Sequence, residues 1–196
     1  MGTGPSPLGA QRLPAAFYRR PGPVVARDLL GRILCRRLPD GTVLRGRVVE
    51  VEAYDGPADR ASHAFRGLTP RNRSMFEAGG LAYVYLIYGL HHCLNVVTGE
   101  AGHPSAVLLR ATTPPGAVPA SGPGRLAQAF RVDRSLDGAS FLPGPLWLEA
   151  GAPVADPAVR RTRRIGVESA GPWWAARRLR FVIAGHPDVS GPRALR

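Results

Sequence analysis

VVEVEAY, residues 48–54, is a strand-forming run in which apolar and polar side chains alternate. Successive side chains of a strand point to opposite faces of the sheet. Glu50, Glu52 and Tyr54 therefore share one face, and the apolar residues between them share the other. A strand with an apolar back and two carboxylates and a tyrosine on its front is predicted to form the wall of a site.

A second run, LAYVYLIY at residues 81–88, supplies three more tyrosines. Tyr83 and Tyr85 share one face of this predicted strand, and Tyr88 lies on the other. Flat rings gathered in a basic stretch are suited to hold a nucleobase, and each stack contributes about 1–3 kcal/mol. The alternative is that tyrosine is simply a good strand former.

Composition predicts a folded domain with a polyanionic partner. The chain has 196 residues, of which 44% are hydrophobic, enough for one real core. All 26 basic residues are arginines, and they face only 14 acidic residues, for a net charge of +12. The arginine fork binds phosphate oxygens in pairs, so the excess favours nucleic acid. The absence of lysine excludes Schiff-base chemistry at an ε-amine.

Cysteine and histidine usage predicts neither a metal nor a cofactor. Cys35 and Cys93 lie far apart, and no paired spacing typical of zinc is present. His91, His92 and His103 lack a helical partner at the spacing that a metal site needs. Reduced thiols and the lack of a signal-peptide or membrane-spanning run predict a cytoplasmic, bacterial-type protein that meets the nucleoid through DNA and no membrane.

Taken in order, the chain predicts an α+β fold with a mostly antiparallel sheet. Residues 1–14 are expected to be a mobile tail, and 15–196 a single domain. Residues 156–164 are expected to form an arginine-rich helix or loop. Helices are expected at 15–20, 24–38, 69–76 and 125–132, and strands at 42–54, 81–88, 93–97, 106–111, 145–149 and 180–184.

Three polar residues in apolar strands are candidates for chemistry. Glu52, at the end of a strand and beside a tyrosine, is placed to lose solvent and to deprotonate a water. Glu50 has the same pattern, so spacing leaves both open, and a structural salt bridge is the alternative for either. Arg110 ends an apolar strand and needs a partner such as Glu52. Asn95 must satisfy its amide, which is then available to read the edge of a ligand.

Two further features are candidates for contact with DNA. Tyr88, at the tip of the predicted hairpin, is placed to wedge between base pairs; the alternative is an ordinary turn with an exposed ring. Arg71 and Arg73 flank the start of a short predicted helix, where amides and guanidiniums together favour phosphate. The alternative for this pair is a solvated basic turn.

These residues together resemble the alkyladenine DNA glycosylase family, also called the 3-methyladenine DNA glycosylase family. The resemblance covers about residues 15–190, in order and with nearly continuous spacing. It is carried by EVEAY at 50–54, His63, TPRNRSMF at 69–76, YVYLIYG at 83–89, Asn95, VLLRA at 107–111, SGPGRL at 121–126 and RIGV at 164–167.

The resemblance implies a single α+β domain with a curved antiparallel sheet, surrounding helices and a protruding hairpin. It implies a monomeric hydrolase of base excision repair that needs no cofactor and acts on double-stranded DNA. Its substrates would be alkylated or deaminated purines of the 3-methyladenine, 7-methylguanine, hypoxanthine and ethenoadenine class. Because no lysine is present, we expect hydrolysis to an abasic site without strand cleavage.

The resemblance also implies a role for individual residues. Glu52 matches the general base that activates the attacking water, and Arg110 and the carbonyl of Ile165 match the groups that hold this water. The chain departs from the family pattern at Glu168-Ser169 and His91-His92. The remaining matches are the rings that enclose the flipped base (Tyr54, His63, Tyr85), the asparagine that disfavours guanine (Asn95), the pocket floor (Leu108) and the wedge in the minor groove (Tyr88).

The sequence leaves two rival interpretations open. The run Leu142-Pro143-Gly144 is similar to the hairpin of the helix-hairpin-helix glycosylases, but the residues that follow do not fit that turn, and the strand content argues against it. A DNA- or RNA-binding module with an inactive pocket is the non-enzymatic rival. The presence of both Glu52 and Arg110 argues against it.

Overall fold

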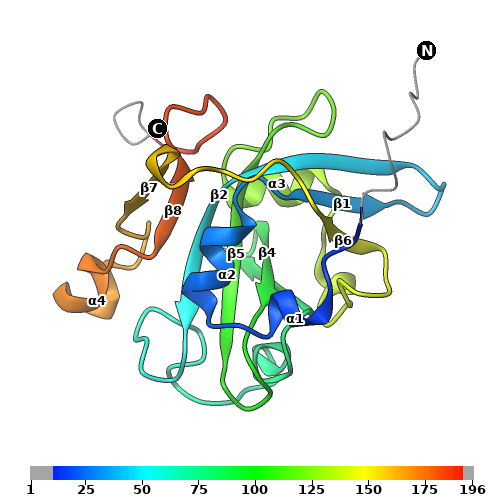
Figure 1. The fold of residues 1–196 in the computed structure, drawn as a ribbon. Helices are drawn as coiled ribbons and strands as arrows, with labels where there is room; N and C mark the ends of the chain where they lie inside the picture. Colours follow the sequence, from blue (N-terminus) through cyan, green and yellow to red (C-terminus); the bar gives the residue numbers. More distant parts are fainter. Residues whose placement is uncertain (1–10, 192–196) are drawn as a thin grey trace.

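The longest strand, β2 (Val43–Asp55), pairs with three other strands and connects the two parts of the sheet. The structure is a computed structural model that describes residues 11–191. The first half of β2 pairs with β1 (Ile33–Arg37), and its second half lies between β5 (Ser105–Thr112) and β8 (Arg180–Ile183). All three pairings are antiparallel, and β2 spans the sheet from one side to the other (Figure 1).

The remaining strands complete one curved antiparallel sheet. They are β3 (Ala82–Ile87), β4 (His91–Val97), β6 (Leu146–Glu149) and β7 (Val159–Thr162). Along the sheet the order is β3-β4-β5-β2-β1-β6, while β8 pairs with β2 and β7 pairs with β8. The α+β class, the antiparallel sheet and the β3–β4 hairpin confirm the fold expected from the sequence.

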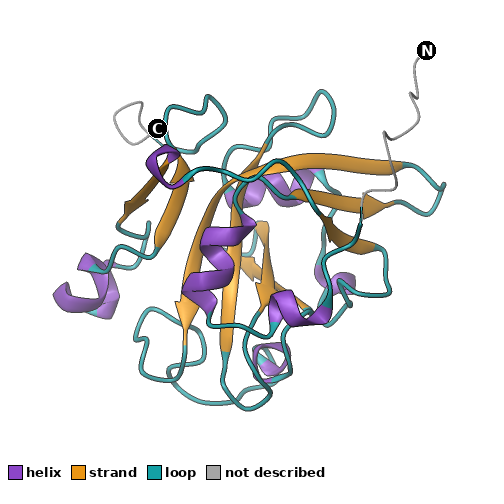
Figure 2. Cartoon of the chain, viewed as in Figure 1, coloured by secondary structure: helices purple, strands orange, loops and turns teal. Residues whose placement is uncertain are grey.

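Short helices cover this sheet (Figure 2). The α-helices are α1 (Ala15–Tyr18), α2 (Gly22–Leu29), α3 (Pro123–Ala129) and α4 (Pro172–Ala176). Four single 3-10 turns are η1 (Arg73–Phe76), η2 (Arg134–Leu136), η3 (Asp156–Ala158) and η4 (Glu168–Ala170). The helix α2 packs on β2 and β5 and buries Val25 and Leu29, whereas α3 packs against β4 and β5.

The helix expected over residues 24–38 is wrong in its second half. Helix α2 ends at Leu29, and β1 begins at Ile33. Between them Gly31 takes a φ of +86°, and a Cβ at this position would lie 2.4 Å from the carbonyl oxygen of Ala152, so only glycine fits the turn between α2 and β1. The following residues then pair with β2 on one side and with β6 on the other. Pairing with two distant strands outweighs the local helical pattern.

The helix or loop expected at residues 156–164 is also wrong. Only Asp156–Ala158 form a helical turn, and β7 follows and pairs with β8. As an edge strand with one neighbour, β7 leaves its arginines exposed to water. A strand of this kind lacks the apolar signal by which strands are recognised.

The N-terminal segment is anchored where the structure describes it. Residues 1–10 of the tail expected at 1–14 lie outside the described residues. Arg12 forms a β-bridge with Glu149, and Leu13 donates its backbone N–H to the carbonyl of Leu148 and is buried. Residues 11–13 thus extend the sheet beside β6, and the mobility expected of the tail stays a prediction.

Candidate active site

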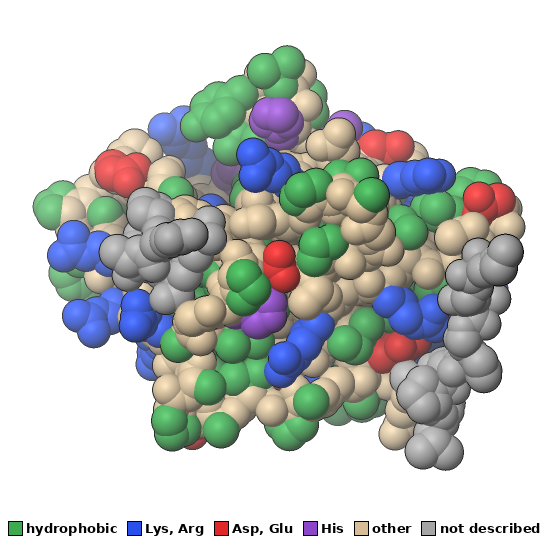
Figure 3. All heavy atoms as spheres, turned by 90° about the horizontal axis from the view of Figure 1, so that it is seen from above, with side chains coloured by type: hydrophobic (Ala, Val, Ile, Leu, Met, Phe, Trp, Pro, Cys, Tyr) green, Lys and Arg blue, Asp and Glu red, His purple; other side chains and the backbone are tan. Residues whose placement is uncertain are grey.

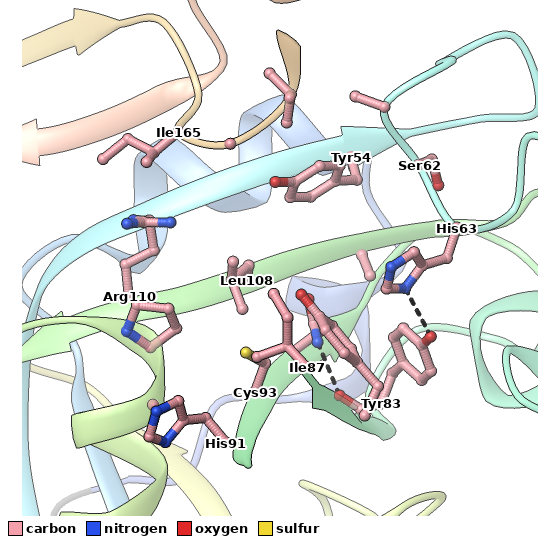
Figure 4. Close-up of a pocket in the computed structure, with 18 of the residues that line it drawn as sticks. Tyr54, Ser62, His63, Tyr83, Ile87, His91, Cys93, Leu108, Arg110 and Ile165 are labelled. Atoms are coloured by element: carbon pink, nitrogen blue, oxygen red, sulfur yellow. Dashed lines mark hydrogen bonds between the residues drawn. The ribbon is translucent and has the colours of Figure 1, made fainter. Parts of the chain in front are cut away.

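A cavity of about 330 Å³ lies where β2, β3, β4 and β5 meet the start of α3 at residues 123–124 and the loops at residues 61–63 and 165–167. Figure 4 shows Tyr54 and Ile165 on one side of this cavity, and His63 and Tyr83 at one end. Segments that are far apart in sequence thus bring several aromatic side chains and the guanidinium of Arg110 to the same cavity.

Glu52 lies immediately behind the wall of this cavity. Its carboxylate is fully buried and accepts hydrogen bonds from the hydroxyl of Tyr54 (2.9 Å) and the backbone N–H of Ile165 (2.9 Å). The guanidinium of Arg110 lies 3.3 Å from the same carboxylate. These three partners all line the cavity. The carboxylate is therefore held in one orientation by groups that a ligand in the cavity would touch.

Burial raises the pKa of Glu52 above its ordinary value. Arg110, the amide of Ile165 and the hydroxyl of Tyr54 act in the opposite direction but do not cancel the loss of water. A carboxylate that is hard to keep charged is a stronger base than one in water. Burial also raises the pKa of Tyr54, so this hydroxyl stays protonated and donates to Glu52.

Glu50, the other candidate carboxylate, is locked into an ion-pair network. It accepts from Arg110 (2.8 Å) and Arg180 (2.7 Å), and from the N–H (2.6 Å) and hydroxyl (2.9 Å) of Ser190. Burial alone would raise the pKa of Glu50, but the two arginines and the Ser190 amide outweigh it and lower the pKa. Geometry therefore separates the two carboxylates that spacing left open: Glu50 orients Arg110, and Glu52 faces the cavity wall.

Three rings form the aromatic end of the cavity. The ring centroids of His63 and Tyr85 lie 4.5 Å apart with the planes nearly perpendicular, and Tyr83 lies 5.5 Å from Tyr85. His63 Nδ1 and the Tyr83 hydroxyl are hydrogen-bonded at 2.9 Å, as Figure 4 shows. Loss of water lowers the pKa of His63, and Arg71 acts in the same direction, so the imidazole is neutral at pH 7.

Asn95 and Leu108 form a cross-strand pair on the cavity lining. The Asn95 side chain donates to the backbone carbonyl of Tyr83 at 2.9 Å, which fixes its orientation. The thiol of Cys93 also lines the cavity, and burial raises its pKa, so it stays uncharged. The sequence offered no signal for Cys93 beyond its apolar surroundings.

Tyr88 stands at the tip of the β3–β4 hairpin with 86% of its surface exposed. Tyr88 and Gly89 have φ values of +52° and +68°, and Leu90 donates its N–H back to Ile87 at 3.1 Å. Two positive φ values characterise the type I′ turn, which matches the twist of the hairpin. A bulky residue other than glycine is strained in this conformation. The turn thus holds an aromatic ring in water, where neither packing nor backbone geometry favours it.

Arg71 and Arg73 flank Asn72, the N-cap of η1, as expected, but this helix is a single 3-10 turn that begins at Arg73 and not the longer helix expected over residues 69–76. Arg71 lies over the ring of Tyr85 at 5.6 Å and donates to the carbonyl of Leu86 at 3.2 Å. Arg73 is exposed. Figure 3 shows that arginines are also spread over the face seen from above, with acidic side chains scattered among them.

Sequence reasoning missed the groups that brace the site. Arg180 is fully buried and opens the apolar strand β8, the same pattern that singled out Arg110 at the end of β5. Arg164 lies over the ring of Tyr54 at 4.6 Å and forms two hydrogen bonds, of 2.5 and 2.9 Å, with buried Asp59. No pattern in the sequence marks the ion pair of Arg164 and Asp59.

Within residues 11–191, no helix is long and apolar enough to cross a membrane. In the same range, no group of three or more histidine, cysteine, aspartate or glutamate side chains is arranged to hold a metal ion.

Comparison with known proteins shows the family of this chain. A family model described as methylpurine-DNA glycosylase (MPG) matches residues 16–187. The chain therefore belongs to the methylpurine-DNA glycosylase family, hydrolases that act on N-glycosidic bonds of DNA.

Individual relatives agree with this placement. A human protein named DNA-3-methyladenine glycosylase is 40% identical over 94% of this chain and 70% of its own length. Proteins assigned as 3-methyladenine DNA glycosylases are similar over 92% of this chain in two bacteria. They are 46% identical over 89% of the protein from Herpetosiphon aurantiacus and 50% identical over 86% of the protein from Anaeromyxobacter dehalogenans strain 2CP-1.

Proposed function

We propose that this enzyme flips alkylated or deaminated purines out of duplex DNA and hydrolyses the N-glycosidic bond with a water activated by Glu52. The observation that carries the proposal is the buried Glu52 carboxylate, held behind the wall of an aromatic cavity by Tyr54, Arg110 and the Ile165 amide. A water in the cavity beside Arg110 and the Ile165 carbonyl would lie next to this base. Measuring base release from duplexes that carry single lesions tests the proposal.

The aromatic rings would hold the extruded base. A base within a duplex is unreachable, and extrusion costs a few kcal/mol. Tyr54, His63 and Tyr85 line a cavity large enough for a purine, and an alkylated purine is cationic and is attracted by electron-rich ring faces. Asn95 would disfavour guanine by crowding its exocyclic amine, with Leu108 as the floor.

One carboxylate is sufficient for a leaving group that is already charged. Most glycosidases need a second carboxyl group that protonates the departing oxygen. Glu50 is the nearest candidate, but Arg110 and Arg180 keep it ionised. The site therefore favours cationic purines, whose departure needs no added proton. The absence of lysine leaves hydrolysis to an abasic site as the expected outcome, without strand cleavage.

The rate of base release should fall in acid at a higher pH than for an ordinary glutamate. The charged form of Glu52 is the base, and burial raises its pKa, so protonation begins above the usual range. The measurement is single-turnover release against pH with a cationic lesion. Tyr54→Phe removes a hydrogen bond that stabilises the charged form, so it should move this acid limb to still higher pH. An unchanged limb in that variant would count against Glu52 as the titrating group.

Tyr88→Ala should weaken binding to lesion-bearing duplex because the wedge would be lost. Replaced stacking is worth about 1–3 kcal/mol, or roughly five- to hundredfold in Kd. Tyr88→Phe keeps the ring and is the matched control, since the exposed hydroxyl is not needed for stacking. Equal affinities for the alanine variant and the unaltered protein would remove the wedge role. The measurement is a titration of fluorescent duplex with and without the lesion.

The monomeric state and the cytoplasmic, nucleoid-associated location expected from the sequence stay predictions. So does the phosphate-binding role of Arg71 and Arg73, although the exposure of both guanidiniums supports it.

A further inference from the structure

A second hollow, of about 300 Å³, adjoins the cavity that would hold the base. Ser62 and His63 line both spaces, so the two spaces adjoin at these side chains. The second hollow is built from the loop at residues 60–72, which connects β2 to η1. Its outer lining includes Arg60, Arg66 and Arg71.

The hollow is positively charged and has no acidic side chain in its lining. Among the described residues, none of its three arginines is ion-paired with a carboxylate. Asp59 lies next in sequence to Arg60, but it is buried and paired with Arg164. Three guanidiniums that share one concave space without counter-charge repel one another, and an anion would relieve that repulsion.

The loop is also held in a defined shape. Asn72 is buried, accepts from the backbone N–H of Thr69 at 2.7 Å, and donates to the carbonyls of His63 (3.0 Å) and Gly67 (2.9 Å). One side chain thus joins both ends of the loop that carries Arg66. Phe65 is 42% exposed in the same hollow, and the Arg60 guanidinium lies 5.6 Å from its ring.

We propose that this hollow binds backbone phosphates of the DNA strand that carries the extruded nucleotide, adjacent to that nucleotide. The inference rests on the proposed function and adds Arg60 and Arg66 to it as phosphate ligands. An extruded nucleotide stays covalently joined to its neighbours, so its strand must leave the base cavity at the mouth. The hollow beyond His63 offers guanidinium forks for phosphate oxygens and an exposed apolar ring, Phe65, for a deoxyribose.

The first test is the salt dependence of DNA binding by Arg60→Gln/Arg66→Gln. Each lost phosphate contact should lower the slope of log K against log salt by about 0.9, or by about 1.8 for the pair. At 0.1 M salt this corresponds to roughly tenfold weaker binding for each contact. The probe is a duplex with one tetrahydrofuran abasic analogue, which cannot be cleaved. Arg19→Gln/Arg37→Gln removes two exposed arginines that line neither space and should leave the slope unchanged.

The second test locates the phosphates. Single methylphosphonates, which are uncharged, are placed next to the analogue on either strand. Neutralising a contacted phosphate should weaken binding by the unaltered protein but add little to the loss in Arg60→Gln/Arg66→Gln, because one interaction cannot be lost twice. Fully additive losses at every position, or coupling only to the opposite strand, would overturn the inference.

The two proposals fail in distinguishable ways. If the unaltered protein releases no base from any lesion while the coupling to neighbouring phosphates is found, the proposed function fails and the phosphate site stands. If base is released and the double variant keeps its affinity and salt slope, only the phosphate site fails. At saturating enzyme, the single-turnover rate should be the same in both proteins, since the arginines bind DNA and do not touch Glu52.

Discussion

Glu52→Gln is expected to lower the single-turnover rate of base release by about 10³-fold while affinity for lesion-bearing DNA stays nearly unchanged. A positioned general base contributes about 10²- to 10⁴-fold, and an amide cannot accept the proton of the attacking water. The size and shape of the side chain are kept, so the aromatic cavity is retained. The measurements are release under enzyme excess and a separate titration of the same duplex.

Folding of this variant must be checked alongside, because both oxygens of Glu52 accept hydrogen bonds. One accepts from the Ile165 amide, and the other accepts from the Tyr54 hydroxyl and forms an ion pair with Arg110. A glutamine amide must turn its NH₂ group toward one of these donors, which weakens that contact. We therefore expect a small loss of thermal stability. A variant that is folded, binds the lesion and releases the base at the original rate would refute the general-base role.

Arg164→Met is expected to destabilise the fold by about 3–5 kcal/mol, the usual cost of leaving one member of a buried ion pair alone. Asp59 would be left without its ion-pair partner in a site with no access to water. The variant would also lose the hydrogen bond to the carbonyl of Ala53 and the contact with the Tyr54 ring. For a chain of this length, each kcal/mol corresponds to about 2–4 °C in Tm. Thermal and urea unfolding measure the loss.

The double variant Asp59→Asn/Arg164→Met separates the unpaired charge from the lost packing. Asp59 now accepts from the backbone N–H of Ala61 with one oxygen (3.0 Å) and from that of Asp55 with the other (3.3 Å), and asparagine keeps one oxygen that can serve the closer donor, Ala61. Removing the charge should restore most of the stability lost by the single variant. If Arg164→Met alone changes the unfolding free energy by less than about 1 kcal/mol, the pair does not make the contribution to stability assigned to it.

The sequence predicts an element correctly where the signal for that element lies within a few neighbouring residues. The alternation of VVEVEAY and LAYVYLIY predicted the strands β2 and β3 because both the pattern and the burial are set within a few residues. The segment Ile33–Arg37 looked helical and became a strand because β2 and β6, from other parts of the chain, pair with its two edges. Strand β7 gave no signal because an edge strand needs no apolar face.

The kinds of chemistry in the site can be seen in the printed residues: a carboxylate beside rings, arginines in apolar strands, and a Tyr-Gly turn. The difference between Glu50 and Glu52 cannot be seen in the printed residues. It depends on Arg180 and Ser190, which lie 130 and 140 positions beyond Glu50, and on the Ile165 amide, which lies 113 positions beyond Glu52. The pKa of a buried carboxylate depends on lost water and on which donors surround it. Those donors come together only when the chain is folded, so residue spacing alone leaves the choice between the two glutamates open.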